Sequence, residues 1–206
     1  MMTKTLSLIF ALSSIVLLSN CSHHKGKSHG KTDHSGECQK CKESEMQPKA
    51  AKYLKHVSEG TPIGKLAAPS YKHMSFTAQP SKEDLAEAKK QGYQVIINLR
   101  APSEISWDEA AYAKSLGLEY YNVPLFNKAE EIDAAAVIKL ERIHMQTHKQ
   151  KQLIHCSTGN RAAAWMAAHM MVKHELSAED ALKVGRKLGI TKKEIEEKVI
   201  TFSQKI

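Results

Sequence analysis

Short apolar segments recur along the chain from about residue 69 onwards, and longer segments with helical spacing separate them. The segment 94–99, QVIINL, is a continuous apolar run bounded by glycine and proline. Such a run is typical of a strand that is buried on both faces of a parallel sheet. The same pattern predicts strands over residues 70–76, 94–99, 118–123 and 151–156.

Helices are predicted between and after these strands. Several begin with a serine or threonine followed three residues later by an acid, which is a helix-capping signal. The capping pairs are Ser81 with Asp84, Ser106 with Glu109, Ser177 with Asp180 and Thr191 with Glu194. Apolar residues at helical spacing predict two more helices, over residues 132–148 and 162–174.

The order of elements indicates the fold class. Strands that alternate with helices form a mostly parallel sheet covered on both faces. We therefore expect an α/β fold with a four- to five-stranded, mostly parallel sheet flanked by helices, and with three C-terminal helices. Ligands in such sheets bind beyond the carboxyl ends of the strands, where the segment HCSTGNR (155–161) is expected to lie.

The N-terminus has the pattern of an export signal. Lys4 precedes an apolar run over residues 6–18, which is short for a membrane span but suits a secretory signal peptide. Residues 1–20 are therefore predicted to be a signal peptide. The run ends in LLSNC, which resembles a bacterial lipoprotein box with Cys21 as the lipidated residue, although Asn20 departs from the usual small residue. We expect an exported protein, lipid-anchored to a bacterial membrane and facing the periplasm or exterior; the alternative is an ordinary signal peptide with an incidental Cys21.

Residues 21–60 are predicted to be a flexible tether, because they contain few apolar side chains to bury. The tether carries His23, His24, His29 and His34, followed by the pair Cys38 and Cys41 in a CxxC spacing. Thiolate and imidazole suit zinc or copper, but a lone CxxC also fits a spacer with a small disulfide. We favour the spacer and expect no metal or other cofactor. Residues 61–206 are the predicted catalytic domain.

Composition adds one constraint on partners. The chain has 30 Lys and Arg against 22 Asp and Glu, a formal net charge of +8. Such a surplus favours anionic partners. Because no arginine-rich run or series of base-stacking aromatic residues is present, we expect no nucleic-acid partner.

The segment HCSTGNR has the residues of an anion-binding loop with a nucleophile. Cys156 follows a predicted strand, and Arg161 begins a predicted helix. The intervening amides of Ser157, Thr158, Gly159 and Asn160 can turn towards an oxyanion, and the helix N-terminus adds positive potential that favours a thiolate. Arg161 can bind two oxygens at once. His155 ends the strand beneath the loop and is expected to orient it.

This loop and its surroundings resemble the bacterial dual-specificity and tyrosine-phosphatase-like family, which is also found attached to beta-lactamase-hydrolase-like proteins. The resemblance covers FTAQPSKEDLAEAKKQGYQVIINLR, GLEYYNVP and LIHCSTGNRAAAWMAAHMM, followed by LSAEDALKVGRKLGI. It implies a cysteine-phosphatase-like fold and a phosphocysteine intermediate on Cys156, with Arg161 and the loop amides holding the phosphoryl group. The implied substrate is a phosphorylated small molecule or a phosphoprotein.

The loop length departs from that family. Tyrosine and dual-specificity phosphatases place five residues between cysteine and arginine, whereas four stand between Cys156 and Arg161. Short loops are common in rhodanese sulfurtransferases, but Asn98 stands where those enzymes usually carry an aspartate. We favour a phosphatase and keep open a sulfurtransferase that uses a Cys156 persulfide. A non-catalytic anion-binding module is the third alternative.

Phosphate-ester cleavage also needs a general acid for the leaving oxygen. Glu104 and Asp108 follow one strand, and Glu130, Glu131 and Asp133 follow another. Our candidates are Asp108, Glu130, Glu131 and Asp133, although acids at helix starts are also explained by capping. Arg100 is expected either to add positive potential or to pair with Glu104.

Overall fold

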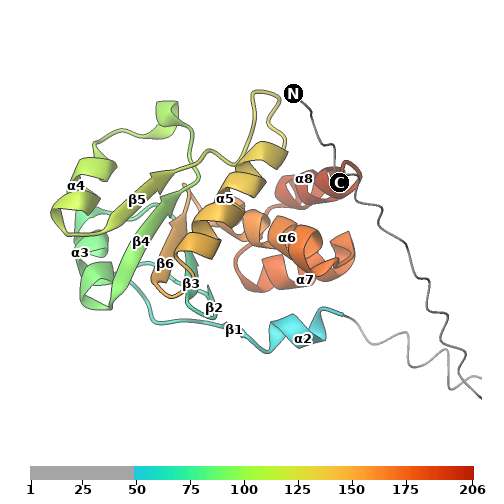
Figure 1. Cartoon of the computed structure of the whole chain (residues 1–206), viewed down its shortest axis with the longest axis horizontal. Helices are drawn as coiled ribbons and strands as arrows, with labels where there is room; N and C mark the ends of the chain where they lie inside the picture. Colours follow the sequence, from blue (N-terminus) through green and yellow to red (C-terminus); the bar gives the residue numbers. More distant parts are fainter. Residues whose placement is uncertain (1–48) are drawn as a thin grey trace, which may run out of the picture.

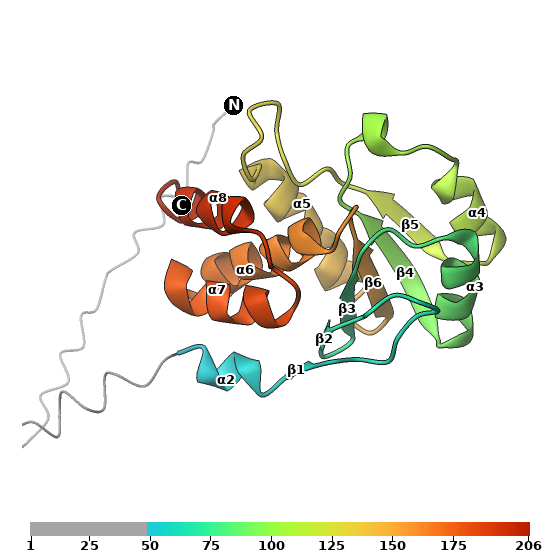
Figure 2. The ribbon, with the colours of Figure 1, turned by 180° about the vertical axis from the view of Figure 1, so that it is seen from behind.

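The computed structural model describes residues 49–206. A central sheet is covered by α3 (Lys82–Lys90) and α4 (Glu109–Ser115) on one face. The other face carries α5 (Ala134–Gln146), α6 (Asn160–His174), α7 (Ala178–Lys187) and α8 (Lys193–Ser203), as the two opposite views show (Figures 1 and 2). The predicted α/β class with three C-terminal helices is confirmed.

The sheet has six strands in the order β1-β2-β3-β6-β4-β5. The four strands from β3 to β5 in this order are parallel, as predicted, and β1 and β2 extend the β3 edge in antiparallel pairing. The strands are β1 (Val57–Ser58), β2 (Ser70–Tyr71), β3 (Met74–Thr77), β4 (Tyr93–Asn98), β5 (Glu119–Asn122) and β6 (Lys151–His155).

The sheet therefore has more strands than the predicted four to five. The segment 70–76, predicted as one strand, forms a tight hairpin in which Tyr71 pairs with Met74. The chain reverses at Lys72, whose φ of 56° is left-handed. A lysine does not signal such a turn, because L side chains rarely adopt this conformation.

The folded part begins before the predicted domain boundary at residue 61. The short helix α2 (Ala51–Leu54) precedes β1, which pairs with β2. Tyr53, Leu54 and Val57 pack against the larger core. Residues 49–60 are thus part of the packed unit rather than of a tether. The predictions for residues 1–20, Cys21, Cys38 and Cys41 lie outside the described residues.

Two of the predicted caps are confirmed and two are wrong. Ser81 and Ser177 cap α3 and α7 by accepting the backbone N–H groups of Asp84 and Asp180. Helix α4 is capped by Asp108 rather than Ser106, and α8 begins after Lys192 rather than at Thr191. The N–H of Thr191 donates instead to Asn160 Oδ1, at 2.8 Å.

Helix α6 lies in the larger of two cores and positions the loop that precedes it. From Ala162 to Ala168 every residue of this helix is buried, and Trp165 is fully enclosed. The many alanines let other elements pack closely on all sides of the helix, as expected for a buried helix. No helix in residues 49–206 is both long enough and apolar enough to span a membrane.

Candidate active site

The loop of residues 156–159 joins β6 to α6 at the carboxyl edge of the sheet. Gly159 precedes the helix with a left-handed φ of 88°, which costs glycine little because it lacks a Cβ. The turn directs the Gly159 N–H at Cys156 Sγ, at 3.2 Å. A bridge between Thr158 and Ala78 fixes the outer side of the loop.

Cys156, the predicted nucleophile, lies at the base of this turn with no exposed surface. Its sulfur accepts an amide N–H and lies just before the N-terminus of α6. Both features place positive potential at the sulfur. Within residues 49–206, Cys156 is the only cysteine.

Arg161, the predicted oxyanion ligand, is held by a carboxylate. Its two terminal nitrogens lie 2.7 Å from the two oxygens of Glu104, and Nη2 also donates to Ser157 Oγ at 3.0 Å. The bond from Arg161 lowers the pKa of Glu104 to about 2, despite the opposing effect of partial burial. The pKa of Arg161 is raised, by Glu104 first, with Cys156 adding to the effect. An anion that uses the Arg161 fork must therefore displace or share the Glu104 carboxylate.

A cavity of about 420 Å³ opens beside Arg161. Its wall includes Glu104, Phe126 and Glu130, and Phe126 places its ring 5.8 Å from the Arg161 guanidinium carbon. Cys156 is not among the lining residues. The cavity therefore reaches Arg161 but not the sulfur.

The four candidate general acids are placed very differently. Asp108 and Asp133 cap α4 and α5 through bonds to backbone N–H groups. Glu131 pairs with Lys205 on the surface, at 2.7 Å. Glu130 alone among the four lines the cavity beside Arg161. Glu104 also lines it, but a carboxyl group with a pKa near 2 is ionised at neutral pH and has no proton to give.

His155 lies beneath the loop, as expected, and has a partner that the sequence did not reveal. Its Nε2 is 2.7 Å from Glu109 Oε1, and both side chains are completely buried. Asn98 and Gln79 each donate a side-chain N–H to Glu109 Oε2, at 3.1 Å. In the sequence, Glu109 has the position of an ordinary first-turn acid of α4. The signal for a buried polar contact is Asn98, a polar residue at the buried end of β4 that donates to Glu109.

Arg100 and Asn160 take structural roles. Arg100 donates to Gln79 Oε1 at 2.5 Å and to the backbone carbonyl of Glu104. Of the two alternatives for Arg100, a pairing with the Glu104 carboxylate is therefore wrong, whereas its positive charge contributes to the lowered pKa of Glu104. Asn160, predicted to bind phosphate, directs its side-chain oxygen to the N–H groups of Thr191 and Lys192. Because its Oδ1 accepts hydrogen bonds from these two N–H groups, the Asn160 side chain connects the loop to the start of α8.

No metal centre accompanies the loop. Within residues 49–206, no group of three or more His, Cys, Asp or Glu side chains is placed to hold a metal ion. The groups that the described residues bring to this edge of the sheet are a thiol, an arginine, backbone amides and carboxyl groups.

Comparison with known protein sequences gives weak matches. No family model matches the chain. Beta-lactamase hydrolase-like proteins from two strains of Xylella fastidiosa are 26% identical to it over 121 residues, which is 56% of this chain. The chain spans only 27% of the length of these relatives.

Several solved structures of similar fold carry the description of phosphatases. The kinase-associated phosphatase KAP matches with a TM-score of 0.59 at 19% identity, over 71% of this chain and 97% of its own. TpbA of P. aeruginosa matches with a TM-score of 0.57 at 14% identity, over 73% and 91%. A DUF442 protein from Shewanella putrefaciens matches with a TM-score of 0.53 at 15% identity, over 75% and 96%. The chain thus has the fold of cysteine-based phosphatases.

Proposed function

We propose that this protein is a cysteine-dependent phosphatase that cleaves phosphate monoesters. The observation that carries the proposal is the turn in which the Gly159 N–H contacts Cys156 Sγ while Arg161, two residues on, borders the adjoining cavity. A thiolate, amides and a guanidinium at one turn suit the attack of sulfur on an anionic centre. The fold shared with KAP and TpbA supports the same reading.

The reaction proceeds in two steps. The Cys156 thiolate attacks phosphorus, the ester P–O bond breaks, and the leaving oxygen takes a proton from a general acid. Water then attacks the phosphocysteine, releasing inorganic phosphate and restoring the thiolate. Arg161 and the loop amides bind the phosphoryl oxygens, and Glu130, which lines the cavity, is the best-placed donor of the proton.

The substrate is a phosphorylated small molecule or a phosphoprotein, and an aryl phosphate fits best. Phe126 lines the cavity next to Arg161 and offers an aromatic surface beside the guanidinium. A cysteine-to-serine variant of TpbA was crystallised with phosphotyrosine. Both observations favour phosphate carried on a ring.

The test is turnover of p-nitrophenyl phosphate and of phosphotyrosine peptides. We expect phosphate release by the wild type and none by Cys156→Ser. A wild type inactive on aryl, protein and inositol phosphates would overturn the proposal. Phosphate binding that survives in Cys156→Ser, without turnover by the wild type, would instead identify an anion-binding module.

Sulfur transfer is the second candidate, because only four residues separate Cys156 from Arg161. In this reaction the thiolate attacks the outer sulfur of thiosulfate, the S–S bond breaks, and sulfite leaves with the electron pair. Cyanide then takes the outer sulfur from the Cys156 persulfide as thiocyanate and restores the thiolate. Thiocyanate formation without phosphatase activity would favour this candidate.

We further propose that the protein is exported and anchored to a bacterial membrane through a lipid on Cys21. The support is the apolar run over residues 6–18 and the LLSNC segment that follows it. Metabolic labelling with a radioactive fatty acid is expected to mark the wild type and not Cys21→Ser. Equal labelling of both proteins would contradict this assignment.

A further inference from the structure

The outer surface of α5 and α6 combines exposed apolar and basic side chains. Ile138 and Met145 on α5 are 58% and 61% exposed, Val172 on α6 is 41% exposed, and Ile206 at the chain end is 59% exposed. Lys139, Arg142, Lys149 and Lys173 are exposed on the same two helices and the turn that follows α5. We call these eight residues the α5–α6 face.

The basic residues of this face have no acidic partner within residues 49–206. None of its four cations lies in an ion pair with a described carboxylate, whereas Lys183 and Arg186 on α7 and Lys193 on α8 each do. Free positive charge beside exposed apolar side chains is a combination that a folded protein does not need for its own stability. It indicates an external anionic and apolar partner.

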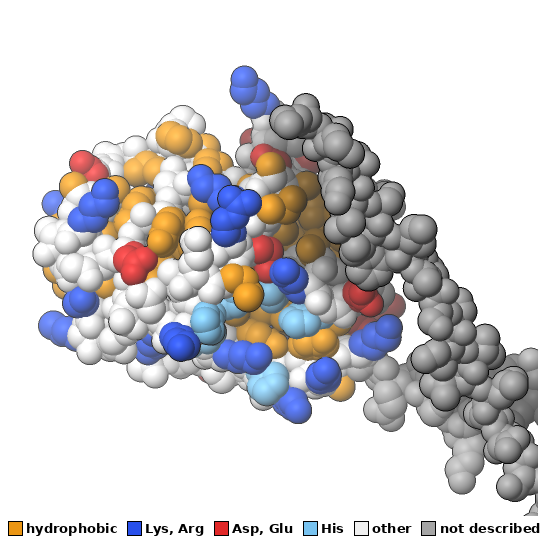
Figure 3. Space-filling view, in the orientation of Figure 1, with side chains coloured by type: hydrophobic (Ala, Val, Ile, Leu, Met, Phe, Trp, Pro, Cys, Tyr) orange, Lys and Arg blue, Asp and Glu red, His pale blue; other side chains and the backbone are white. Residues whose placement is uncertain are grey.

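Two adjoining depressions mark the face. An apolar groove of about 600 Å³ is lined by Ile138, Val172, Phe202 and Ile206 among others. A second pocket, of about 390 Å³, is lined by Met145, Lys173 and several histidines. Val172 and Lys173 are neighbours on α6, so the two depressions are adjacent. Figure 3 shows histidine, Lys and Arg side chains gathered around apolar ones in the lower part of this view.

We infer that the α5–α6 face docks on a lipid bilayer that contains anionic headgroups. The exposed stripe of α5 mixes Ile138 and Met145 with Lys139 and Arg142, a pattern typical of a helix lying at a membrane interface. Long basic side chains keep their charge among headgroups while apolar neighbours enter the acyl boundary. The apolar groove also includes one exposed acid, Glu175, among its lining residues.

The position of the face suits this role. The ring centroids of Tyr53 and His174 lie 4.8 Å apart, and His174 lines the histidine pocket. The described chain therefore begins beside the face. His73 and Met74, where β3 begins, line the same pocket. The Cys156 loop lies at the other, carboxyl edge of the sheet, so docking leaves the loop accessible. The inference does not depend on which reaction the loop performs.

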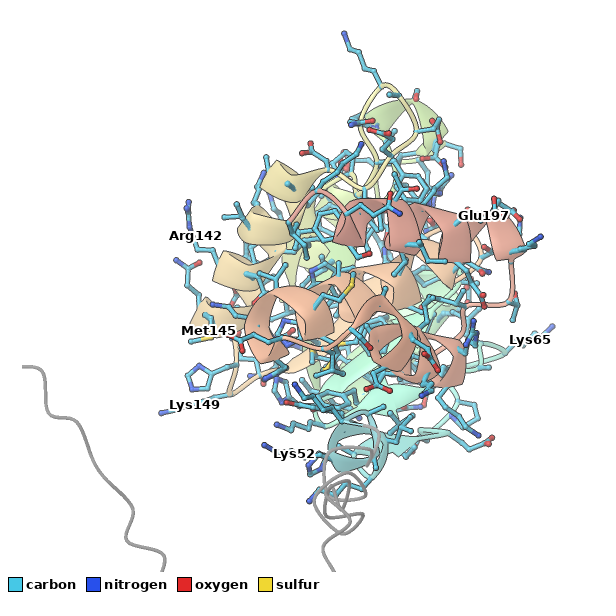
Figure 4. The ribbon with its side chains drawn as sticks, turned by 90° about the vertical axis from the view of Figure 1, so that its right-hand side faces the viewer. Lys52, Lys65, Arg142, Met145, Lys149 and Glu197 are labelled. Carbon is cyan, nitrogen blue, oxygen red and sulfur yellow. The ribbon has the colours of Figure 1, made fainter. Side chains whose placement is uncertain are left out.

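The experiment compares two charge-reversed double variants of the full chain. Arg142→Glu with Lys149→Glu changes the face, and Lys65→Glu with Lys114→Glu makes the same change of net charge elsewhere. Figure 4 shows Arg142, Met145 and Lys149 on one side of the molecule and Lys65 on the other. Binding is measured by co-sedimentation with vesicles of phosphatidylcholine, alone and mixed with phosphatidylglycerol. Because the proposed signal peptide or a lipid on Cys21 would itself bind vesicles of either composition, the quantity compared is the gain in binding on adding phosphatidylglycerol.

We expect the wild type and the Lys65/Lys114 variant to bind the anionic vesicles alike. In the Arg142/Lys149 variant, the increase in vesicle binding on adding phosphatidylglycerol should be smaller by roughly tenfold or more. A benzophenone-bearing residue in place of Met145 should cross-link to lipid, and one in place of Lys65 should not. Equal losses in the two double variants would show a net-charge effect only and overturn the inference. Cross-linking from position 145 to a second copy of the chain, without lipid, would overturn it as well.

Discussion

Both carboxylate oxygens of Glu104 lie 2.7 Å from the terminal nitrogens of Arg161. The two residues are 57 positions apart, and the short 3-10 helix Pro102–Glu104 brings the carboxylate to the loop. A bidentate carboxylate occupies the same fork that a phosphate or sulfate would use. Glu104 is therefore placed both to orient Arg161 and to compete with anionic ligands.

Removing the charge of Glu104 is expected to strengthen anion binding. Glu104→Gln leaves the guanidinium without a charged competitor, so inorganic phosphate should inhibit the enzyme at a concentration roughly tenfold lower, since charge-assisted bonds contribute about 1.5–3 kcal/mol. Inhibition constants for phosphate provide the measurement. Glu197→Gln, on the exposed part of α8, is the control. Weaker phosphate binding in Glu104→Gln would show that orientation of Arg161 outweighs competition.

Glu130 is expected to matter only for poor leaving groups. An aryl oxide with a low pKa leaves without a proton, whereas an alkyl oxide needs one. Glu130→Gln should therefore lower kcat for alkyl phosphates by about 100-fold or more and change kcat for p-nitrophenyl phosphate little. Glu131→Gln is the matched control, because Glu131 pairs with Lys205 outside this cavity. Equal losses on both substrate types would exclude Glu130 as the proton donor.

Substitution of the loop glycine, Gly159, tests whether its amide is needed for activity separately from its effect on stability. Gly159 and Gly92 have φ values of 88° and 83°, and an added Cβ would meet nothing closer than 3.5 Å at Gly159 and nothing within 4 Å at Gly92. Alanine at either position should thus lower the free energy of unfolding by a similar amount, about 1–2 kcal/mol. Only Gly159→Ala should also reduce activity, because it shifts the amide that contacts Cys156 Sγ. Denaturant titrations and turnover of both variants check this; full activity in Gly159→Ala would contradict the role of that amide.

The strand, loop and helix around Cys156 could be predicted because their signals are local. An apolar run, a glycine and a helical pattern follow one another along residues 151–174. The Glu104–Arg161 and Glu109–His155 contacts could not be predicted, because each joins segments that only the tertiary fold brings together. First-turn acids such as Glu109 are common for reasons of capping alone, so nothing in the sequence marked this one as buried.

The hairpin at Lys72 and the role of Asn160 were missed for related reasons. The segment 70–76 contains no glycine, asparagine or proline to signal a turn, and the reversal is fixed by pairing of Tyr71 with Met74. The prediction for Asn160 concerns its backbone N–H and stays a prediction. The sequence does not show that its side-chain oxygen accepts the N–H of Thr191, 31 residues away at the start of α8.

Two stacked histidines are expected to make stability depend on pH. The rings of His73 and His144 lie 5.5 Å apart, and burial is the main cause that lowers the pKa of each. Nearby positive groups lower the pKa of His73 further, whereas a hydrogen bond with Gln152 partly opposes the lowering for His144. The unfolded chain then binds protons more readily than the folded one, so stability present above the ordinary pKa of 6.5 is lost as the pH falls below it. Denaturant titrations between pH 8 and pH 5, roughly the range in which histidine titrates, should show this loss. A smaller loss is expected for His73→Gln with His144→Gln, and a wild type that gains stability on acidification would contradict the assignment.

Removing one partner of the buried Glu109–His155 pair beneath the loop should strongly destabilise the folded protein. Glu109 and His155 have no exposed side-chain surface, and Glu109 also accepts bonds from Asn98 and Gln79. Glu109→Ala is expected to lower the free energy of unfolding by about 3–5 kcal/mol, because it leaves buried polar groups without partners.

A double-mutant cycle distinguishes a direct interaction between Glu109 and His155 from a simple loss of packing. Glu109→Gln and His155→Gln should each destabilise the protein, and the double variant should be less destabilised than the sum of the two, since the partners are in direct contact. The same variants report on the loop: because His155 immediately precedes Cys156, loss of its partner should lower kcat more than it changes KM. Additive effects on unfolding, or an unchanged kcat in a folded Glu109→Gln protein, would show that the pair supports the sheet edge without positioning the nucleophile.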